Sequence, residues 1–224
     1  GDRPADLAEM ADVRDLAAVA VCASSAVAVA IGMWGPVAGG GLPVRAWFGW
    51  HPVLMTLAFP CFMALGRFSY AAGSLPGRQC RRAVHRALMV LGVLAALAGY
   101  LCIFMAHREK RSFFGYNFES HEWAAPSRVA HGLLGYGVLL LAILQANMGM
   151  MKMESLKTGL RPFPFHGALG KAILALAALT ILLAVGFWGW SASFKVPLAA
   201  LVAAALLGVG VLLPADKGAA EERP

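Results

Sequence analysis

The sequence predicts an all-α integral membrane protein with six transmembrane helices. Two observations predict this fold class: the composition of the chain and six long stretches without a charged residue. The 224 residues are 59% hydrophobic and 14% charged, whereas soluble domains average about 45–50% apolar and about 25% charged residues. This composition excludes a soluble globular domain, a disordered chain and a nucleic-acid-binding protein. None of the four cysteines lies at CxxC spacing, so we predict neither a zinc site nor a disulfide framework.

Each of the six stretches lacks Asp, Glu, Lys and Arg and is long enough to cross a bilayer, which takes about 20 apolar residues. Inside lipid the backbone has to satisfy its own hydrogen bonds, so each stretch is expected to be a helix. Pro36 and the glycines at 39–41 predict that the first helix ends near residues 33–35. Six consecutive uncharged stretches argue against the alternative, the buried helices of a soluble bundle. The stretches are Leu16–Val44, Ala46–Gly66, Ala87–Ala106, Val129–Met151, Ala172–Phe194 and Val196–Ala215.

The expected organisation is an N-terminal tail (1–15), a six-helix transmembrane domain (16–214) and a charged C-terminal tail (215–224). The opening tail carries five acidic residues and two arginines, unlike the basic start of a secretory signal peptide. The two tails and the even-numbered loops between helices hold 13 of the 19 basic residues, and the other loops hold 6. Because basic loops stay in the cytoplasm, both termini are predicted to be cytoplasmic.

Four of the six histidines open the four middle helices: His51, His85, His131 and His166. Consecutive helices enter the membrane from opposite faces. The first and third of these histidines are therefore predicted to lie near the non-cytoplasmic face, and the other two near the cytoplasmic face. The spacing within each hairpin is nearly equal, 34 and 35 residues, which indicates a loose internal repeat.

Imidazoles inside a membrane are candidates for function, because ionisable groups there are costly. Two histidines from facing helices can fill both axial positions of a haem iron, which leaves electron transfer as the chemistry of the site. One such pair near each face would carry electrons across the bilayer. A metal-ion or proton transporter that uses the same imidazoles stays open as an alternative. Small residues beside two of the histidines leave room for a porphyrin or for helix packing: Gly132, Gly135, Gly167 and Gly170.

The segments around the four histidines resemble the cytochrome b561 family, from about His51 to Trp190. The segments are HPVLM followed by TLAFPCFMALGR, then RRAVHR, SRVAHGLLGY and PFPFHGALG. The resemblance is greatest to members that consist of this domain alone. It implies two haem b groups per chain, with the axial pairs His51/His131 and His85/His166.

The resemblance also implies an activity, that of a transmembrane ascorbate-dependent oxidoreductase. Cytoplasmic ascorbate would be the electron donor, and monodehydroascorbate or a ferric chelate would be the acceptor on the other side. No side chain would take part in covalent catalysis. A multi-pass position in the bilayer and a homodimer are further expectations, and no nucleic-acid partner is expected.

Ascorbate is an anion at neutral pH, so basic side chains near each haem are candidate substrate-binding residues. The same cytoplasmic residues would also follow from the positive-inside bias alone. The cytoplasmic candidates are Arg78, Arg81, Arg82, Arg86, Lys152 and Lys157. The non-cytoplasmic candidates are His107, Arg108 and His121.

Two other function classes remain at this point. One is a bis-histidine haem subunit of a quinol-linked redox complex, which would need partner subunits and a quinone pocket. The other is a haem-free metal or proton transporter. The six stretches contain no Asp or Glu, which counts against the transporter because such carriers usually need an intramembrane carboxylate.

Overall fold

The computed structural model describes residues 5–37 and 39–214, and within them six helices are long and apolar enough to cross a membrane. This confirms the predicted all-α, six-span fold class. The second and sixth spans each contain a π-helical segment, written η1 and η2. The helices are α1 (Ala5–Trp34), α2 (Trp47–Thr56), η1 (Leu57–Met63), α3 (Ala64–Phe68), α4 (Gly77–Arg108), α5 (Pro126–Lys157), α6 (His166–Phe187), α7 (Ala192–Ala203) and η2 (Ala204–Leu212).

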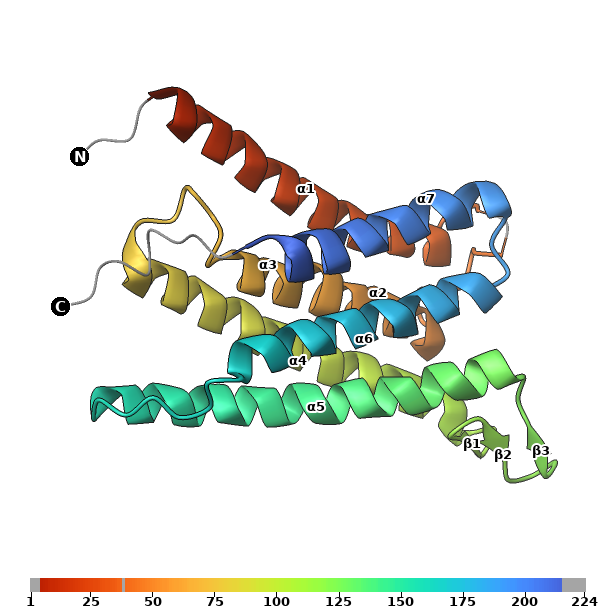
Figure 1. The fold of residues 1–224 in the computed structure, drawn as a ribbon. Helices are drawn as coiled ribbons and strands as arrows, with labels where there is room; N and C mark the ends of the chain where they lie inside the picture. Colours follow the sequence, from red (N-terminus) through yellow and green to blue (C-terminus); the bar gives the residue numbers. More distant parts are fainter. Residues whose placement is uncertain (1–4, 38, 215–224) are drawn as a thin grey trace.

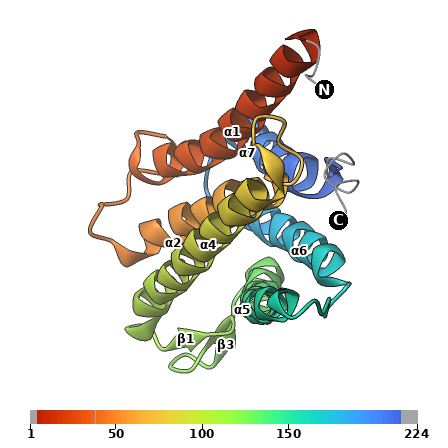
Figure 2. The same ribbon diagram turned by 90° about the vertical axis from the view of Figure 1, so that its left-hand side faces the viewer.

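The spans lie roughly side by side, with α1 and α7 on one flank and α5 on the opposite flank (Figures 1 and 2). The second span, from α2 to α3, packs along α4, and α5 packs mainly along α6. In its most apolar stretch α5 has 11% of its residues buried, whereas the second span has 44%. The other helices therefore cover α5 much less than they cover the second span.

The two ends of the bundle differ in structure. At one end a small antiparallel sheet connects α4 to α5, formed by β1 (Ser112–Phe113), β2 (Tyr116–Asn117) and β3 (Glu122–Trp123). We call this the sheet end. The opposite end holds the loops 69–76 and 158–165, with Arg82 and Arg86 nearby, and we call it the basic end. From the sequence, only a loop was expected where the sheet lies.

The first helix ends at Trp34, as predicted, but it begins at Ala5, inside the segment expected to be a tail. Asp15 is buried, and its carboxylate accepts hydrogen bonds from the backbone N–H and the hydroxyl of Ser74, at 2.8 and 2.7 Å. These bonds tie α1 to the loop that precedes α4. The predicted C-terminal tail, 215–224, lies outside the described residues.

The fifth helix is displaced from its predicted range, since it starts at His166 and ends at Phe187. The prediction used charged residues as helix boundaries. Lys171 lies inside the helix, and the turn at 188–191 contains no charge, so both boundaries were missed. The next helix then begins at Ala192, before Lys195 rather than after it.

Candidate functional site

The histidines of the sheet end face each other across the bundle. His51 lies in the first turns of α2 and His131 in the first turns of α5, with their ring centroids 6.3 Å apart and their planes at 89°. Two imidazoles that bind one metal ion through Nε2, at about 2 Å each, hold their centroids roughly 6 Å apart. The separation of this pair therefore fits one shared metal ion.

Backbone carbonyls orient both rings. The Nδ1–H of His51 donates to the carbonyl of Gly99 at 3.0 Å, and that of His131 donates to the carbonyl of Thr180 at 2.8 Å. A carbonyl oxygen only accepts, so Nδ1 has to carry the hydrogen, and in a neutral ring Nε2 then has a free lone pair. This is the tautomer that a histidine needs to bind a metal through Nε2.

A cavity of about 380 Å³ adjoins both rings, within the range of cofactor pockets in proteins. Gly132 and Gly135 line it. A Cβ atom added at Gly132 would meet nothing within 4 Å, and one at Gly135 would meet only the Thr180 methyl group, at 3.8 Å. The rest of the lining is mainly apolar and comes from five spans, with Met33, Met55, Phe59, Val138 and Ile181 among it. The space and its lining suit a large, flat, apolar group between the rings.

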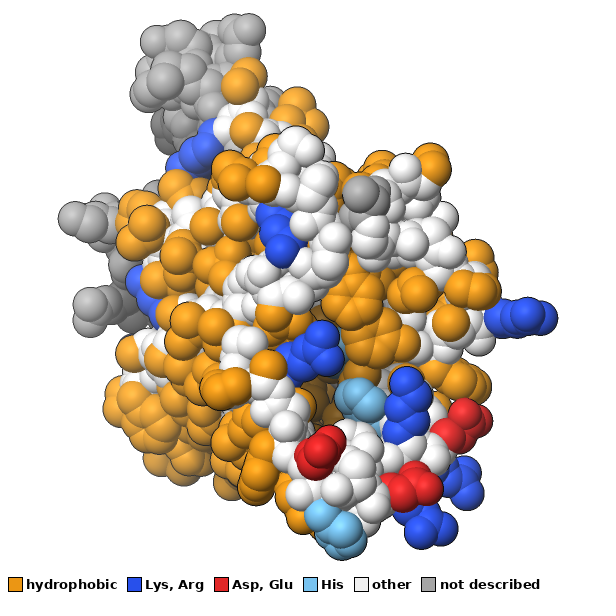
Figure 3. Space-filling model, turned by 90° about the vertical axis from the view of Figure 1, so that its right-hand side faces the viewer, with side chains coloured by type: hydrophobic (Ala, Val, Ile, Leu, Met, Phe, Trp, Pro, Cys, Tyr) orange, Lys and Arg blue, Asp and Glu red, His pale blue; other side chains and the backbone are white. Residues whose placement is uncertain are grey.

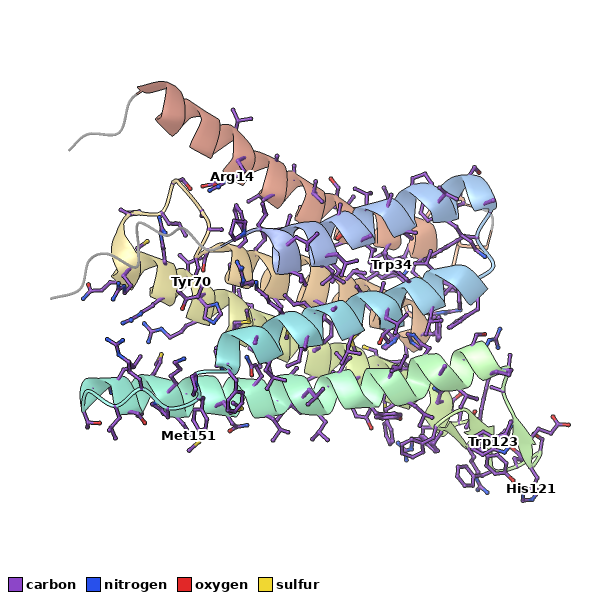
Figure 4. The ribbon with its side chains drawn as sticks, in the orientation of Figure 1. Arg14, Trp34, Tyr70, His121, Trp123 and Met151 are labelled. Atoms are coloured by element: carbon purple, nitrogen blue, oxygen red, sulfur yellow. The ribbon has the colours of Figure 1, made fainter. Side chains whose placement is uncertain are left out.

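The cavity reaches the surface at the sheet end, where Figure 3 shows a hollow with basic and histidine side chains at its rim. Of the three candidate substrate-binding residues at this end, His107 lines the cavity. The other two candidates of this end do not line it. Arg108 is exposed at the end of α4. His121 is exposed in the turn between β2 and β3, with its Nδ1 3.4 Å from the hydroxyl of Tyr116 (Figure 4).

Among the polar residues that line this cavity, Arg128, Tyr100 and Tyr136 were not predicted as site residues from the sequence. The guanidinium carbon of Arg128 lies 5.9 Å from the centroid of the Phe187 ring, at the mouth. A signal was available for this arginine, because it precedes His131 by three residues and so shares its helix face. The tyrosine rings, 5.8 Å apart, come from α4 and α5 and carried no comparable signal.

At the basic end, His85 lies in the third turn of α4 and His166 is the first residue of α6. The Nδ1–H of His85 donates to the carbonyl of Gly66 at 2.8 Å, and the ring of Tyr70 lies 5.0 Å from its ring. His166 is close enough to His85 to interact with it electrostatically. Its own Nδ1 is buried and has no hydrogen-bond partner among the described residues.

The second span and α4 form a hairpin in which each histidine bonds to a glycine carbonyl of the other helix. Side chains larger than hydrogen would not fit well at these glycines. A Cβ atom at Gly99 would lie 3.2 Å from the Cβ of Leu54, and one at Gly66 would lie 3.2 Å from the Cβ of Leu88. Glycine at both positions thus lets the helices approach closely enough for these hydrogen bonds.

The basic residues predicted to bind substrate at the basic end are in different environments. Arg82 and Arg86 are exposed. Arg81, in contrast, is 5% exposed, and its Nε and Nη1 donate to the carbonyls of Leu75 and Tyr70 at 3.2 and 3.3 Å. Arg81 therefore holds the loop before α4 and does not lie on an open rim.

Burial raises the pKa of the Tyr70 hydroxyl, and the positive charges of Arg82 and Arg86 partly oppose this effect. Tyr70 was not among the residues predicted from the sequence.

The two lysine candidates already have partners within the protein. Lys152 donates to the carbonyl of Phe163 at 3.3 Å, and Lys157 pairs with Glu154 at 2.8 Å. Arg78 is half-buried at the start of α4.

The four histidines thus lie two at each end of the bundle, and the rings of His51 and His131 face each other. Among the described residues, no three His, Cys, Asp or Glu side chains come together as a metal site. Two protein ligands are too few for a zinc site, which needs three or four. They are the number that a haem iron takes from a protein when the macrocycle supplies its other four ligands.

Comparison with known proteins agrees with this arrangement. No curated protein and no solved structure matches the chain. The family model described as "Eukaryotic cytochrome b561" matches residues 50–191, which is more than half of the chain and includes all four histidines. The chain therefore belongs to the eukaryotic cytochrome b561 family, in which haem cytochromes transfer electrons across membranes.

Proposed function

We propose that His51 and His131 hold one haem b, that His85 and His166 hold a second, and that the chain carries single electrons from cytoplasmic ascorbate to an acceptor across the membrane. The observation that carries the proposal is the spacing of the sheet-end pair, 6.3 Å between centroids, beside an apolar cavity of about 380 Å³. A haem with both axial positions filled supplies one-electron transfer, since no coordination site is left for substrate.

The residues around the ligands keep each ring in one orientation. The carbonyls of Gly99, Thr180 and Gly66 each hold one Nδ1–H, so that Nε2 of His51, His131 and His85 stays available for iron. The Thr180 hydroxyl donates to the carbonyl of Leu176 at 2.8 Å and leaves its own carbonyl to the histidine. The apolar lining of the cavity lowers the local dielectric around His51 and His131, which strengthens the hydrogen bonds of these two rings.

We place the basic end in the cytoplasm, because the positive-inside bias of 13 basic residues against 6 points that way. Arg82 and Arg86 are exposed there, and both act on Tyr70, which lies against His85. They are the residues best placed to bind an anionic donor such as ascorbate. Arg78, Lys152 and Lys157 add positive charge, while Arg81 supports the loop.

At the sheet end we propose that His107 and Arg128 bind the acceptor, monodehydroascorbate or a ferric chelate. Both line the cavity where it opens, and fixed positive charge attracts an anion. Arg108 and His121 do not line the cavity, so we assign Arg108 a contribution to the local field only. Two further predictions rest on the family resemblance. One is that the chain forms a homodimer, and the other is that it is most similar to family members that consist of this domain alone.

The test is an absorption spectrum of the purified protein, with haem per chain quantified, before and after addition of ascorbate. We expect a low-spin b-type spectrum, two haems per chain and reduction by ascorbate. A colourless protein after haem-supplemented expression would overturn the proposal in favour of a transporter. Reduction by a quinol but not by ascorbate would instead support a subunit of a quinol-linked complex.

Acceptor and sidedness are tested in vesicles that contain the protein and are loaded with ascorbate. Reduction of external ferric chelate or monodehydroascorbate is expected only where the basic end faces the interior. Sidedness is assigned separately, by protease access to the loop 158–165. Activity restricted to the opposite orientation would contradict the placement of the donor site.

A further inference from the structure

One of the four proposed ligands differs from the rest in what orients it. The Nδ1 atoms of His51, His85 and His131 each bond to a backbone carbonyl. The Nδ1 of His166 is buried and has no partner among the described residues. An unpaired polar group inside a protein is costly, so this atom calls for an acceptor nearby.

A side chain with a matching unpaired atom lies next to it. Gln145, on α5, donates from Nε2 to the backbone carbonyl of His166 at 2.6 Å. The other end of the same amide, Oε1, is also buried and without a partner among the described residues. The two residues are therefore already joined by one hydrogen bond, and each has an unused group, a donor on one and an acceptor on the other.

The packing around the pair is reciprocal. A Cβ atom at Gly149 would lie 3.4 Å from Cε1 of His166, and one at Gly170 would lie 3.2 Å from Nε2 of Gln145. Gly149 follows Gln145 by four residues on α5, and Gly170 follows His166 by four residues on α6, so each glycine shares a helix face with one member of the pair. The imidazole thus lies over a glycine of α5, and the amide lies over a glycine of α6.

We propose that Oε1 of Gln145 accepts the Nδ1–H of His166, so that Gln145 is the positioning residue for this haem ligand. The inference rests on the proposed function. The terminal torsion of a glutamine is soft, so a turn of the amide is enough to bring Oε1 towards the ring. A side-chain carbonyl then has the role that backbone carbonyls have at the other three histidines, and it holds the tautomer whose Nε2 faces the iron.

The proposal predicts an effect on electron affinity as well as on binding. A hydrogen bond to Nδ1–H raises the basicity of the ring and stabilises ferric iron, so it lowers the reduction potential of the haem. Replacing Gln145 with an apolar residue should raise the reduction potential of the haem held by His85 and His166. It should also lower the affinity of the protein for this haem roughly tenfold. The haem of the sheet end should keep its potential.

The experiment compares Q145L and Q145E with the matched control N147L, by haem per chain and by redox titration followed optically. Asn147 lies two residues further along α5, is exposed, and donates to the carbonyl of Ile143 at 2.8 Å. We expect Q145L to raise one of the two potentials and to lose haem, and N147L to match the wild type. Q145E keeps an acceptor oxygen, so it should retain both haems, with the potential at or below that of the wild type.

Two results would overturn the inference. If Q145E and Q145L behave alike, the amide matters only as the donor to the His166 carbonyl. If Q145L leaves both potentials and the haem content unchanged, Gln145 does not orient the ligand. A wild-type protein that binds no haem would be a failure of the proposed function itself, and it would be visible before any variant is made.

Discussion

The two histidine pairs differ in what keeps their rings in place. At the sheet end both rings bond to backbone carbonyls, those of Gly99 and Thr180. At the basic end one ring bonds to the carbonyl of Gly66, and the other, His166, lies beside the side chain of Gln145. A backbone acceptor survives most substitutions, whereas a side-chain acceptor is lost with one. His166 is therefore the proposed ligand whose basicity can be changed by a single substitution, at Gln145.

The comparison is tested most severely by removing one ligand from each pair. H131A and H85A should each lose one of two haems and keep the other, because the pairs share no residue and lie at opposite ends of the bundle. Haem per chain should fall by half, and the redox titration should show a single transition at a different potential in each variant. Loss of both haems from either substitution would mean that the sites are coupled through folding.

The cavity of the sheet end offers a second test that leaves both of its histidines in place. Gly132 lines the cavity, and a Cβ atom added there would have nothing within 4 Å, so G132F should fill the space and exclude the haem of this end only. Gly137, on the exposed side of α5, is the matched control, because it also has open space but does not line the cavity. G137F should keep two haems. Equal haem content in the two variants would contradict the assignment of the cavity.

A third comparison separates the basic residues of the sheet end. Arg128 lines the mouth of the cavity and Arg108 does not, although both are exposed. R128E should raise the KM for an anionic ferric chelate about tenfold, with a smaller effect at high salt, because the charge acts at the point of encounter. R108E should change KM much less. Reduction of the protein by ascorbate should be unaffected in both, which would distinguish acceptor binding from damage to the haems.

The sequence predicted the six spans well, because hydropathy depends on residue type alone. It singled out the four histidines for the same reason, and their role as haem ligands stays a prediction. Six uncharged stretches indicate six helices, and His51 and His166 stand out as ionisable groups at helix starts. The acceptors of the Nδ1–H groups were not predictable in this way, because the carbonyls of Gly99 and Thr180 belong to the backbone and every residue type carries one. Likewise, the turn at 188–191 has no charge, so hydropathy did not separate the last two helices there.

Arg81 and Arg82 illustrate the same limit and support the smallest of the predictions. Consecutive residues of a helix point about 100° apart, so a cluster of arginines includes both buried and exposed members. The structure buries Arg81 against the carbonyls of Leu75 and Tyr70 and exposes its neighbour. R81Q should therefore cost about 1–3 kcal/mol of stability, through carbonyls left unpaired, and change the KM for ascorbate little.

R82Q should do the opposite, with a melting temperature near that of the wild type and a KM for ascorbate raised a few-fold. Thermal unfolding and ascorbate titration of the two variants, measured side by side, check both predictions. A lower affinity for ascorbate in R81Q with unchanged stability would assign the buried arginine to the donor site after all. It would also mean that the loop 69–76 moves away from the basic end when ascorbate binds. The donor site would then include residues that this loop covers in the structure.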